Sequence, residues 1–140
     1  MKKGLTESEI QTCLDQCIQI RKNAYAKYSG FSVGALVIDE AGREFAGVNV
    51  ENASYGLTVC AERNAISAAV AGGMKRIRVL CALADTPVPV VPCGACRQVI
   101  AEFSDKDTIL ILANTKRDYK ILSPEDLMPL PFALGSETAG

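Results

Sequence analysis

The sequence predicts an α/β protein, with a mixed sheet of about five strands and helices on both faces. Short, continuously apolar segments such as Val33–Ile38 have the length and composition of buried strands. They alternate with longer segments whose apolar residues recur at helical spacing. The expected order is helix, strand, strand, helix, strand, helix, strand, strand, helix. Because no internal repeat or linker interrupts this order, residues 1–140 are expected to form a single domain.

A first helix is expected to begin at Thr6, because Thr6-Glu7-Ser8-Glu9 has the form of a capping box. Apolar residues follow at helical spacing to about Tyr25. This apolar stripe includes Cys13 and Cys17, which lie four residues apart and could in principle bind a metal ion. Free cysteine is among the most buried residue types, so we interpret both as core thiols.

A β-hairpin is expected after this helix. Val33–Ile38 and Glu44–Val50 form its strands, and Asp39–Arg43 forms the turn. Asn49 and Glu51 lie where the second strand ends, at a position from which a rigid scaffold often presents binding groups. Ordinary turn polarity also accounts for two polar residues at such a place, so the local pattern alone leaves both interpretations open.

The remaining elements are bounded by glycine, proline or a helix-capping residue. They are a helix over Val59–Val70, a strand over Ile77–Ala84, a helix from Cys93 to Phe103, strands over Thr108–Ala113 and Tyr119–Leu122, and a last helix that starts at Ser123. Cys81 lies inside the first of these strands between apolar residues, and we interpret it as another core thiol.

Three further cysteines fall at the N-termini of two predicted helices, in Cys60-Ala61-Glu62-Arg63 and in Pro92-Cys93-Gly94-Ala95-Cys96-Arg97-Gln98. Exposed backbone N–H groups and the helix dipole lower the pKa of a thiol at such a place, and the thiolate is the form that binds metal. Zinc is the natural candidate. Three thiolates without a fourth protein ligand describe an open, catalytic site, with one zinc ion per chain.

The absence of histidine limits the alternatives. It removes the commonest zinc ligand and general base, and it excludes serine or cysteine nucleophiles that are activated by histidine. Taken alone, Cys93-Gly94-Ala95-Cys96 is also typical of thiol–disulfide enzymes. The matched Cys60 and the adjacent Glu62 favour zinc, because an oxidoreductase needs neither. A disulfide framework would require an oxidising compartment, for which the sequence carries no signal.

Charge and hydropathy point to a small-molecule substrate. The net charge is −1 and no run of lysine or arginine exceeds two residues, so a nucleic-acid polymer is not expected as a partner. The sequence contains neither an N-terminal apolar region of the secretory type nor an apolar run of about 18 residues, so no membrane association is expected. The expected location is the cytoplasm.

Glu62 follows Cys60 by two residues, too close for easy coordination of the same ion but near enough to reach a water on it. We interpret it as a proton carrier, the role of the glutamate in zinc deaminases of nucleobases. With Asn49-Val50-Glu51-Asn52-Ala53, the two cysteine motifs resemble those of the small, homotetrameric cytidine deaminases. The resemblance runs from about Tyr25 to Phe132, nearly the whole chain.

This resemblance implies a three-layer α/β/α fold and zinc-dependent hydrolysis of cytidine and deoxycytidine to uridine and deoxyuridine, with release of ammonia, in pyrimidine salvage. In the family, residues that match Asn49 and Glu51 hydrogen-bond the sugar. The backbone N–H that matches Ala61 binds the pyrimidine, and an aromatic residue that matches Phe31 lies near the nucleoside.

The resemblance further implies a homotetramer with shared active sites, in which the residue that matches Phe132 covers the base from a neighbouring subunit. Three thiolates leave the zinc site with excess negative charge, which weakens zinc as a Lewis acid. Family members use arginines that match Arg63 and Arg97 to draw charge from the sulfurs.

Two other functions stay open. One is deamination of a different cytosine-bearing compound, such as blasticidin S or a nucleotide. Asn49 and Glu51 favour a free nucleoside, because Glu51 would repel a nearby phosphate. The other is a non-enzymatic module in which zinc only holds the fold, and Glu62 argues against it because a structural site has no use for a carboxylate beside a water.

Overall fold

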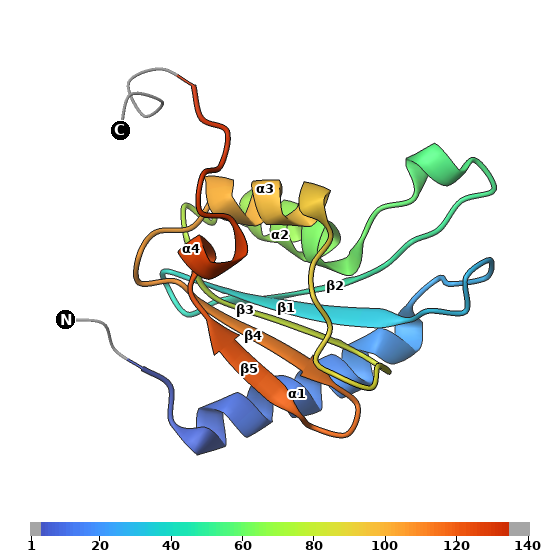
Figure 1. The fold of residues 1–140 in the computed structure, drawn as a ribbon, viewed down its shortest axis with the longest axis horizontal. Helices are drawn as coiled ribbons and strands as arrows, with labels where there is room; N and C mark the ends of the chain where they lie inside the picture. Colours follow the sequence, from blue (N-terminus) through green and yellow to red (C-terminus); the bar gives the residue numbers. More distant parts are fainter. Residues whose placement is uncertain (1–3, 135–140) are drawn as a thin grey trace.

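The computed structural model describes residues 4–134, which form a five-stranded mixed sheet between two layers of helices (Figure 1). The sheet order is β2-β1-β3-β4-β5. β3 and β4 are parallel, and the other neighbouring pairs are antiparallel. The strands are β1 (Val33–Asp39), β2 (Glu44–Val48), β3 (Ile77–Ala84), β4 (Ile109–Asn114) and β5 (Tyr119–Leu122).

Helix α1 (Glu7–Ile20) covers one face of the sheet, and α2 (Ala61–Ala71), α3 (Gly94–Glu102) and the short α4 (Pro124–Leu127) cover the other (Figure 1). Each face has its own apolar core. Successive β4 side chains alternate between the two cores, with Leu110 and Leu112 on the α2 side and Ile109 and Ile111 on the α1 side. The predicted α/β/α fold is therefore confirmed.

The first helix begins where the sequence predicts. Thr6 caps α1, its hydroxyl accepts from the Glu9 N–H at 3.1 Å, and the Glu9 carboxylate accepts from the Thr6 N–H at 2.9 Å. The predicted extension to Tyr25 is wrong. After Ile20 the chain makes one 3₁₀ turn, and the backbone of Tyr25 then pairs with the segment around Val50. Pairing with a distant segment thus ends the helix.

The three cysteines interpreted as core thiols are buried. Cys13 and Cys17 lie on the inner face of α1, and Cys81 lies on β3 opposite them in the same apolar core. The thiol of Cys17 donates to the backbone carbonyl of Cys81 at 3.6 Å. Burial raises the pKa of Cys13 to about 11, so this thiol stays protonated at neutral pH.

Close approach of α2 to β2 requires a glycine at position 47. A Cβ atom there would lie 2.3 Å from the Ala65 nitrogen and 2.4 Å from the Ala61 carbonyl oxygen, far inside van der Waals contact. Ala61 and Ala65 are themselves fully buried and small. This contact sets the height of the α2 N-terminus above the sheet, and that N-terminus, with its N-cap, carries four of the predicted site residues.

The second strand ends at Val48 instead of Val50, and α2 begins at Ala61 instead of Val59. The reason is a bridge between these two segments, in which Val50 and Val59 exchange two backbone hydrogen bonds of 3.0 Å.

No helix within residues 4–134 has both the length and the apolar character that a membrane span requires.

Candidate active site

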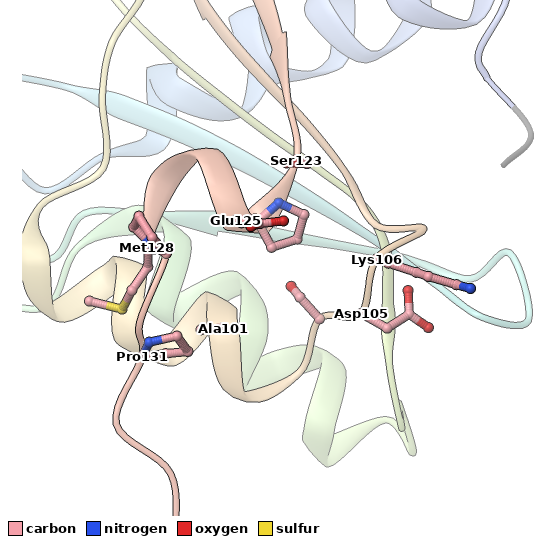
Figure 2. Close-up of a pocket in the computed structure, with 10 residues that line it drawn as sticks. Ala101, Asp105, Lys106, Ser123, Glu125, Met128 and Pro131 are labelled. Atoms are coloured by element: carbon pink, nitrogen blue, oxygen red, sulfur yellow. The ribbon is translucent and has the colours of Figure 1, made fainter. Parts of the chain in front are cut away.

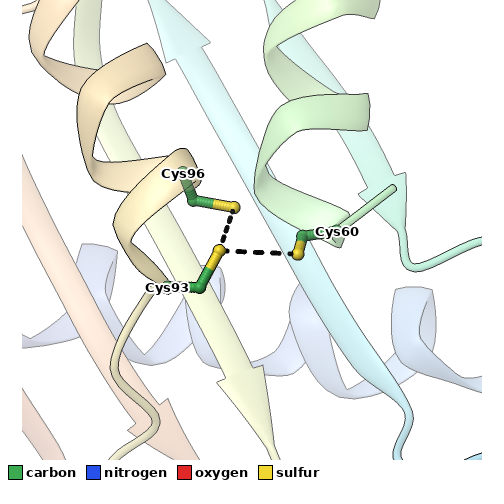
Figure 3. A group of neighbouring side chains, drawn as sticks. All are labelled: Cys60, Cys93 and Cys96. Carbon is green, nitrogen blue, oxygen red and sulfur yellow. Dashed lines mark hydrogen bonds between the residues drawn. The ribbon is translucent and has the colours of Figure 1, made fainter. Parts of the chain in front are cut away.

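The N-termini of α2 and α3 bring three cysteines together on the same side of the sheet (Figure 3). Cys60 is the N-cap of α2, Cys93 is the N-cap of α3, and Cys96 is in the first turn of α3. Both N-cap residues have extended backbones, and neither side chain makes a capping hydrogen bond with its helix. The sulfur atoms thus point toward one another rather than toward the helix ends.

The sulfur positions fit a tetrahedral zinc ion. The Cys60 and Cys93 sulfurs are 3.8 Å apart, those of Cys93 and Cys96 are 3.5 Å apart, and all three lie within 4.8 Å of one another. Zinc–sulfur bonds of about 2.3 Å at tetrahedral angles place two ligands about 3.8 Å apart. Cys93 is exposed and Cys96 is buried. Three candidate ligands are therefore in place, and one side of the cluster stays accessible.

Without a bound cation, ionisation of one thiol in the cluster disfavours ionisation of its neighbours. The pKa of Cys60 is lowered to about 5, mainly by its hydrogen bond with Cys96 and, against the effect of burial, by Arg63. The pKa of Cys96 is raised, because it shares its proton with the Cys60 sulfur and is itself buried. Cys60 and Cys96 therefore share one proton, and the negative charge lies on the Cys60 side. Neighbouring thiolates repel one another, and a bound divalent cation would displace the remaining proton.

Arg63 lies against this cluster, and Arg97 does not. The Nη2 atom of Arg63 donates to the Cys60 sulfur at 3.6 Å, and the pKa of Arg63 is raised by its contacts with Cys60 and Cys96. The guanidinium of Arg97 instead donates to the backbone carbonyls of Pro92 at 2.9 Å and Leu127 at 3.1 Å. In the described structure Arg97 thus fixes the loop before Cys93 and the end of α4.

Glu62 is the second residue of α2 and is nearly fully buried. Burial raises the pKa of its carboxyl group, and the nearby Cys60 adds to this effect, although Arg63 opposes it. A carboxyl group with a raised pKa is suited to gain and lose a proton near neutral pH. Ala61 precedes it as the first residue of the helix, and a backbone N–H at this position has no acceptor within the helix.

The segment with Asn49 and Glu51 pairs directly with the segment that leads to Cys60. Val50 exchanges its two hydrogen bonds with Val59, so Asn49 and Glu51 flank the bridge on the opposite face of the chain. This bridge between Val50 and Val59 thus brings the predicted sugar-binding residues close to the predicted metal ligand Cys60.

Both side chains hold the loop before β1. The Asn49 amide accepts from the Val33 N–H at 2.9 Å and donates to the Phe31 carbonyl at 2.7 Å. The Glu51 carboxylate accepts from the Ser29 hydroxyl and from the N–H groups of Tyr28 at 2.9 Å and Ser29 at 3.0 Å. The hydrogen bonds from Ser29 are the main reason why the pKa of Glu51 is lowered. This carboxylate is therefore ionised at neutral pH.

Glu51 also lines a pocket of about 360 Å³ with five residues: Tyr28, Ser29, Asn52, Tyr55 and Thr58. The rings of Tyr28 and Tyr55 meet edge to face, with centroids 6.2 Å apart. Sequence reasoning missed Ser29 and Tyr55. Tyr28-Ser29-Gly30 signals only the end of a helix, and nothing local indicates that the Ser29 hydroxyl reaches a carboxylate 22 residues away.

The two predicted aromatic contacts are exposed on the described chain, Phe31 by 42% and Phe132 by 70%. The backbone of Phe132 is held by the side chain of Gln98 on α3. Sequence reasoning did not identify Gln98, because its partner lies 34 residues further along the chain.

Figure 2 shows a second pocket, of about 320 Å³, between the C-terminal part of α3 and the segment around α4. None of the predicted site residues lines it. Its hydroxyl groups are already engaged, because Ser104 donates to the Ile100 carbonyl and Ser123 accepts from the Asp126 N–H as the cap of α4. Asp105, on the same wall, pairs with Arg76. The polar side chains that point toward one common position are therefore those of the cysteine cluster, not those of this pocket.

Comparison with curated proteins finds close relatives over most of the chain. A cytidine deaminase of Halalkalibacterium halodurans is 43% identical over 122 residues, which cover 87% of this chain and 92% of the relative. A cytidine deaminase of Sporosarcina psychrophila is 40% identical over 125 residues, which cover 89% and 92%.

Solved structures agree with the sequence relatives. The crystal structure of cytidine deaminase from Burkholderia pseudomallei superposes with a TM-score of 0.84 at 38% identity, and the match covers 91% of this chain and all of that one. Residues 7–112 match the family model of the cytidine and deoxycytidylate deaminase zinc-binding region, and this range includes all three clustered cysteines. The chain therefore belongs to the zinc-dependent cytidine and deoxycytidylate deaminase family.

Proposed function

We propose that the protein hydrolyses cytidine and deoxycytidine to uridine and deoxyuridine, releases ammonia, and uses one zinc ion per chain. The observation that carries this proposal is the arrangement of three sulfurs at zinc spacing beside a buried glutamate, Glu62. Membership of the deaminase family and the names of the relatives at 40% and 43% identity support the same reaction.

Zinc held by Cys60, Cys93 and Cys96 would lower the pKa of a bound water toward neutrality and so supply hydroxide. Glu62 would take a proton from that water and deliver it to N3 of the cytosine ring as C4 is attacked. It would then take the proton of the hydroxyl group formed at C4 and deliver it to the C4 amino group, which leaves as ammonia as the C4 carbonyl forms. Burial of Glu62 favours this role, because it raises the pKa of the carboxyl group toward the range in which both protonation states are accessible.

Arg63 offsets the negative charge of the thiolates through its hydrogen bond with Cys60. The N–H of Ala61, at the free end of α2, is assigned to the pyrimidine ring. Asn49 and Glu51 are assigned to the sugar. An ionised carboxylate can accept about four hydrogen bonds, so Glu51 keeps acceptor capacity for a hydroxyl group beside its three bonds to the loop.

The ionised Glu51 disfavours a nucleotide as substrate, because a phosphate near this carboxylate would meet a like charge. The pocket that Glu51 lines has a volume in the usual range for small-molecule sites. Phe31, part of the loop that Asn49 holds, is assigned to a contact near the nucleoside.

The active site is proposed to be shared within a homotetramer, with the Phe132 ring entering a neighbouring site. Large apolar side chains are exposed around the segment before α2, namely Tyr25, Tyr28, Val50, Tyr55 and Leu57, which suits contact with another copy. Loss of a stacked ring weakens base binding by roughly 5- to 150-fold. Cytoplasmic location, pyrimidine salvage and the lack of a nucleic-acid or membrane partner belong to this proposal as sequence-based predictions.

Mixing two impaired parent variants tests the shared site. A Glu62→Gln chain and a Phe132→Ala chain are combined under conditions in which exchange of subunits is demonstrated by mass. Shared sites predict more activity than the sum of the parents, because some mixed oligomers regain a complete site. Activity equal to that sum contradicts sharing.

One assay tests the reaction itself. Ammonia release is measured with cytidine, deoxycytidine, cytidine monophosphate and blasticidin S as substrates. The proposal predicts turnover of the two nucleosides and much slower turnover of the nucleotide. Equal or faster turnover of the nucleotide or of blasticidin S would favour that substrate, and no turnover with bound zinc would favour a structural zinc module.

A further inference from the structure

Helix α3 holds the C-terminal segment at two consecutive residues. Arg97 donates to the Leu127 carbonyl, at the end of α4. Gln98 then pairs with both backbone groups of Phe132: its Nε2 atom donates to the Phe132 carbonyl at 3.0 Å, and its Oε1 atom accepts from the Phe132 N–H at 3.2 Å. Figure 1 shows the segment after α4, drawn in red, running past α3.

The direction of this contact follows from helix geometry. Gln98 follows Cys96 by two residues, a rotation of about 200° around an α-helix. The side chain of Gln98 therefore leaves α3 on the side away from the buried Cys96 sulfur. The ring of Phe132 is mostly exposed although its backbone is fixed. The ring is thus largely uncovered by the described residues of its own chain.

We propose that Gln98 is a positioning residue for the reaction: it fixes the Phe132 backbone so that the ring is presented, already ordered, to the site of a neighbouring copy. This inference rests on the proposed function of Phe132. Fixing a segment before binding reduces the entropy lost when the ring closes over a base. An amide suits this task, because one side chain supplies both the donor and the acceptor that a peptide unit needs.

Steady-state kinetics with cytidine test the assignment. Gln98→Ala removes both bonds, and Gln98→Glu keeps the acceptor but loses the donor, so both variants are expected to raise KM by about 2- to 12-fold with kcat and zinc content unchanged. Gln19→Ala is the matched control, since Gln19 is an exposed helical glutamine that accepts only from Lys22 among the bonds described. The control is expected to leave KM unchanged.

A double variant separates positioning from a general loss of stability. If Gln98 acts through Phe132, Gln98→Ala has no further effect on KM once Phe132→Ala is present. Multiplied effects of the two substitutions would show that Gln98 acts by another route and would overturn the proposal.

A second readout does not depend on activity. The sequence contains no tryptophan, so Phe132→Trp introduces a single fluorescent reporter at the position in question. Adding Gln98→Ala to this background is expected to lower the fluorescence anisotropy and to increase quenching by acrylamide, while Gln19→Ala changes neither. Unchanged fluorescence with Gln98→Ala contradicts the proposal.

The outcomes distinguish this inference from the function on which it rests. Absence of deamination by the zinc-loaded wild type defeats the proposed function and this inference with it. If the wild type is active and Phe132→Ala raises KM, but Gln98→Ala does not, the proposed function stands and the role of Gln98 is wrong.

Discussion

The Nη2 atom of Arg63 lies 3.6 Å from the sulfur of Cys60 and donates a hydrogen bond to it. Its Nε atom is buried and has no hydrogen-bond partner within residues 4–134. Arg63 thus brings a positive charge to the cluster. Its three thiols, once ionised, would otherwise leave an excess of negative charge. Arg63 therefore offsets part of the negative charge of the site.

Arg63→Gln is therefore expected to lower kcat by about 10- to 100-fold, the usual cost of losing a group that tunes a metal ligand. Arg76→Gln serves as the control, because Arg76 pairs with Asp105 at the surface, away from the cysteines. The measurement is kcat for cytidine, together with the zinc content of both variants. Equal kcat for wild type and Arg63→Gln would show that Arg63 does not tune the charge of the thiolates.

Metal content separates the two groups of cysteines. Cys60→Ser, Cys93→Ser and Cys96→Ser are each expected to lose tightly bound zinc, because each removes one of only three ligands. Cys13→Ser, Cys17→Ser and Cys81→Ser alter the core on the α1 side and should keep one zinc ion per chain. Elemental analysis of purified protein checks this, and zinc retained at full occupancy in any of the first three variants would contradict the ligand set.

Gly47→Ala tests how the fold sets the site. The added methyl group meets the backbone of Ala61 and Ala65, so α2 must shift away from β2. We expect a loss of about 1–3 kcal/mol in the free energy of unfolding, together with weaker zinc binding. Gly56→Ala is the control, because a Cβ atom at Gly56 meets no atom within 4 Å. A Gly47→Ala protein as stable as wild type would show that α2 tolerates the shift.

The sequence predicts those features that depend on neighbouring residues. The capping box at Thr6 fixes the start of α1, and the two cysteine motifs at predicted helix N-termini indicate the three candidate metal ligands, whose sulfurs lie within 4.8 Å of one another. The end of α1 could not be predicted in this way, since it is set by the pairing of Tyr25 with the segment around Val50. Continuous apolar strands are recognisable because both faces of the sheet are covered.

Contacts between side chains and groups that are distant in sequence account for what sequence reasoning missed. Arg97 follows Cys96 in the sequence, but its guanidinium donates to the Leu127 carbonyl, 30 residues away. The bonds of Ser29 to Glu51 and of Gln98 to Phe132 also join separate elements. Such pairs become visible only when the chain is folded.

Asp39 gives a prediction for stability against pH. Its side chain is fully inaccessible in the fold, and burial alone would raise its pKa, but hydrogen bonds from Arg43 and Ala41 outweigh burial and lower it. A carboxyl group whose pKa is lower in the folded state stabilises the fold above its unfolded-state pKa of about 3.9 and loses this effect as the pH falls below it.

Asp39→Asn is accordingly expected to be less stable than wild type at pH 7, with a difference that narrows as the pH falls below about 4. Denaturant unfolding of both proteins across this range measures the difference. A difference that stays constant with pH would mean that the charge of Asp39 does not contribute.

The turnover of Glu62→Gln tests the central claim most directly. The substitution keeps the shape of a buried side chain beside the cysteines but removes its ability to carry a proton. With zinc content and unfolding matched to wild type, we predict that kcat for cytidine falls by about 10²–10⁴-fold. A Glu62→Gln protein that binds zinc and deaminates cytidine at close to the wild-type rate would contradict the account.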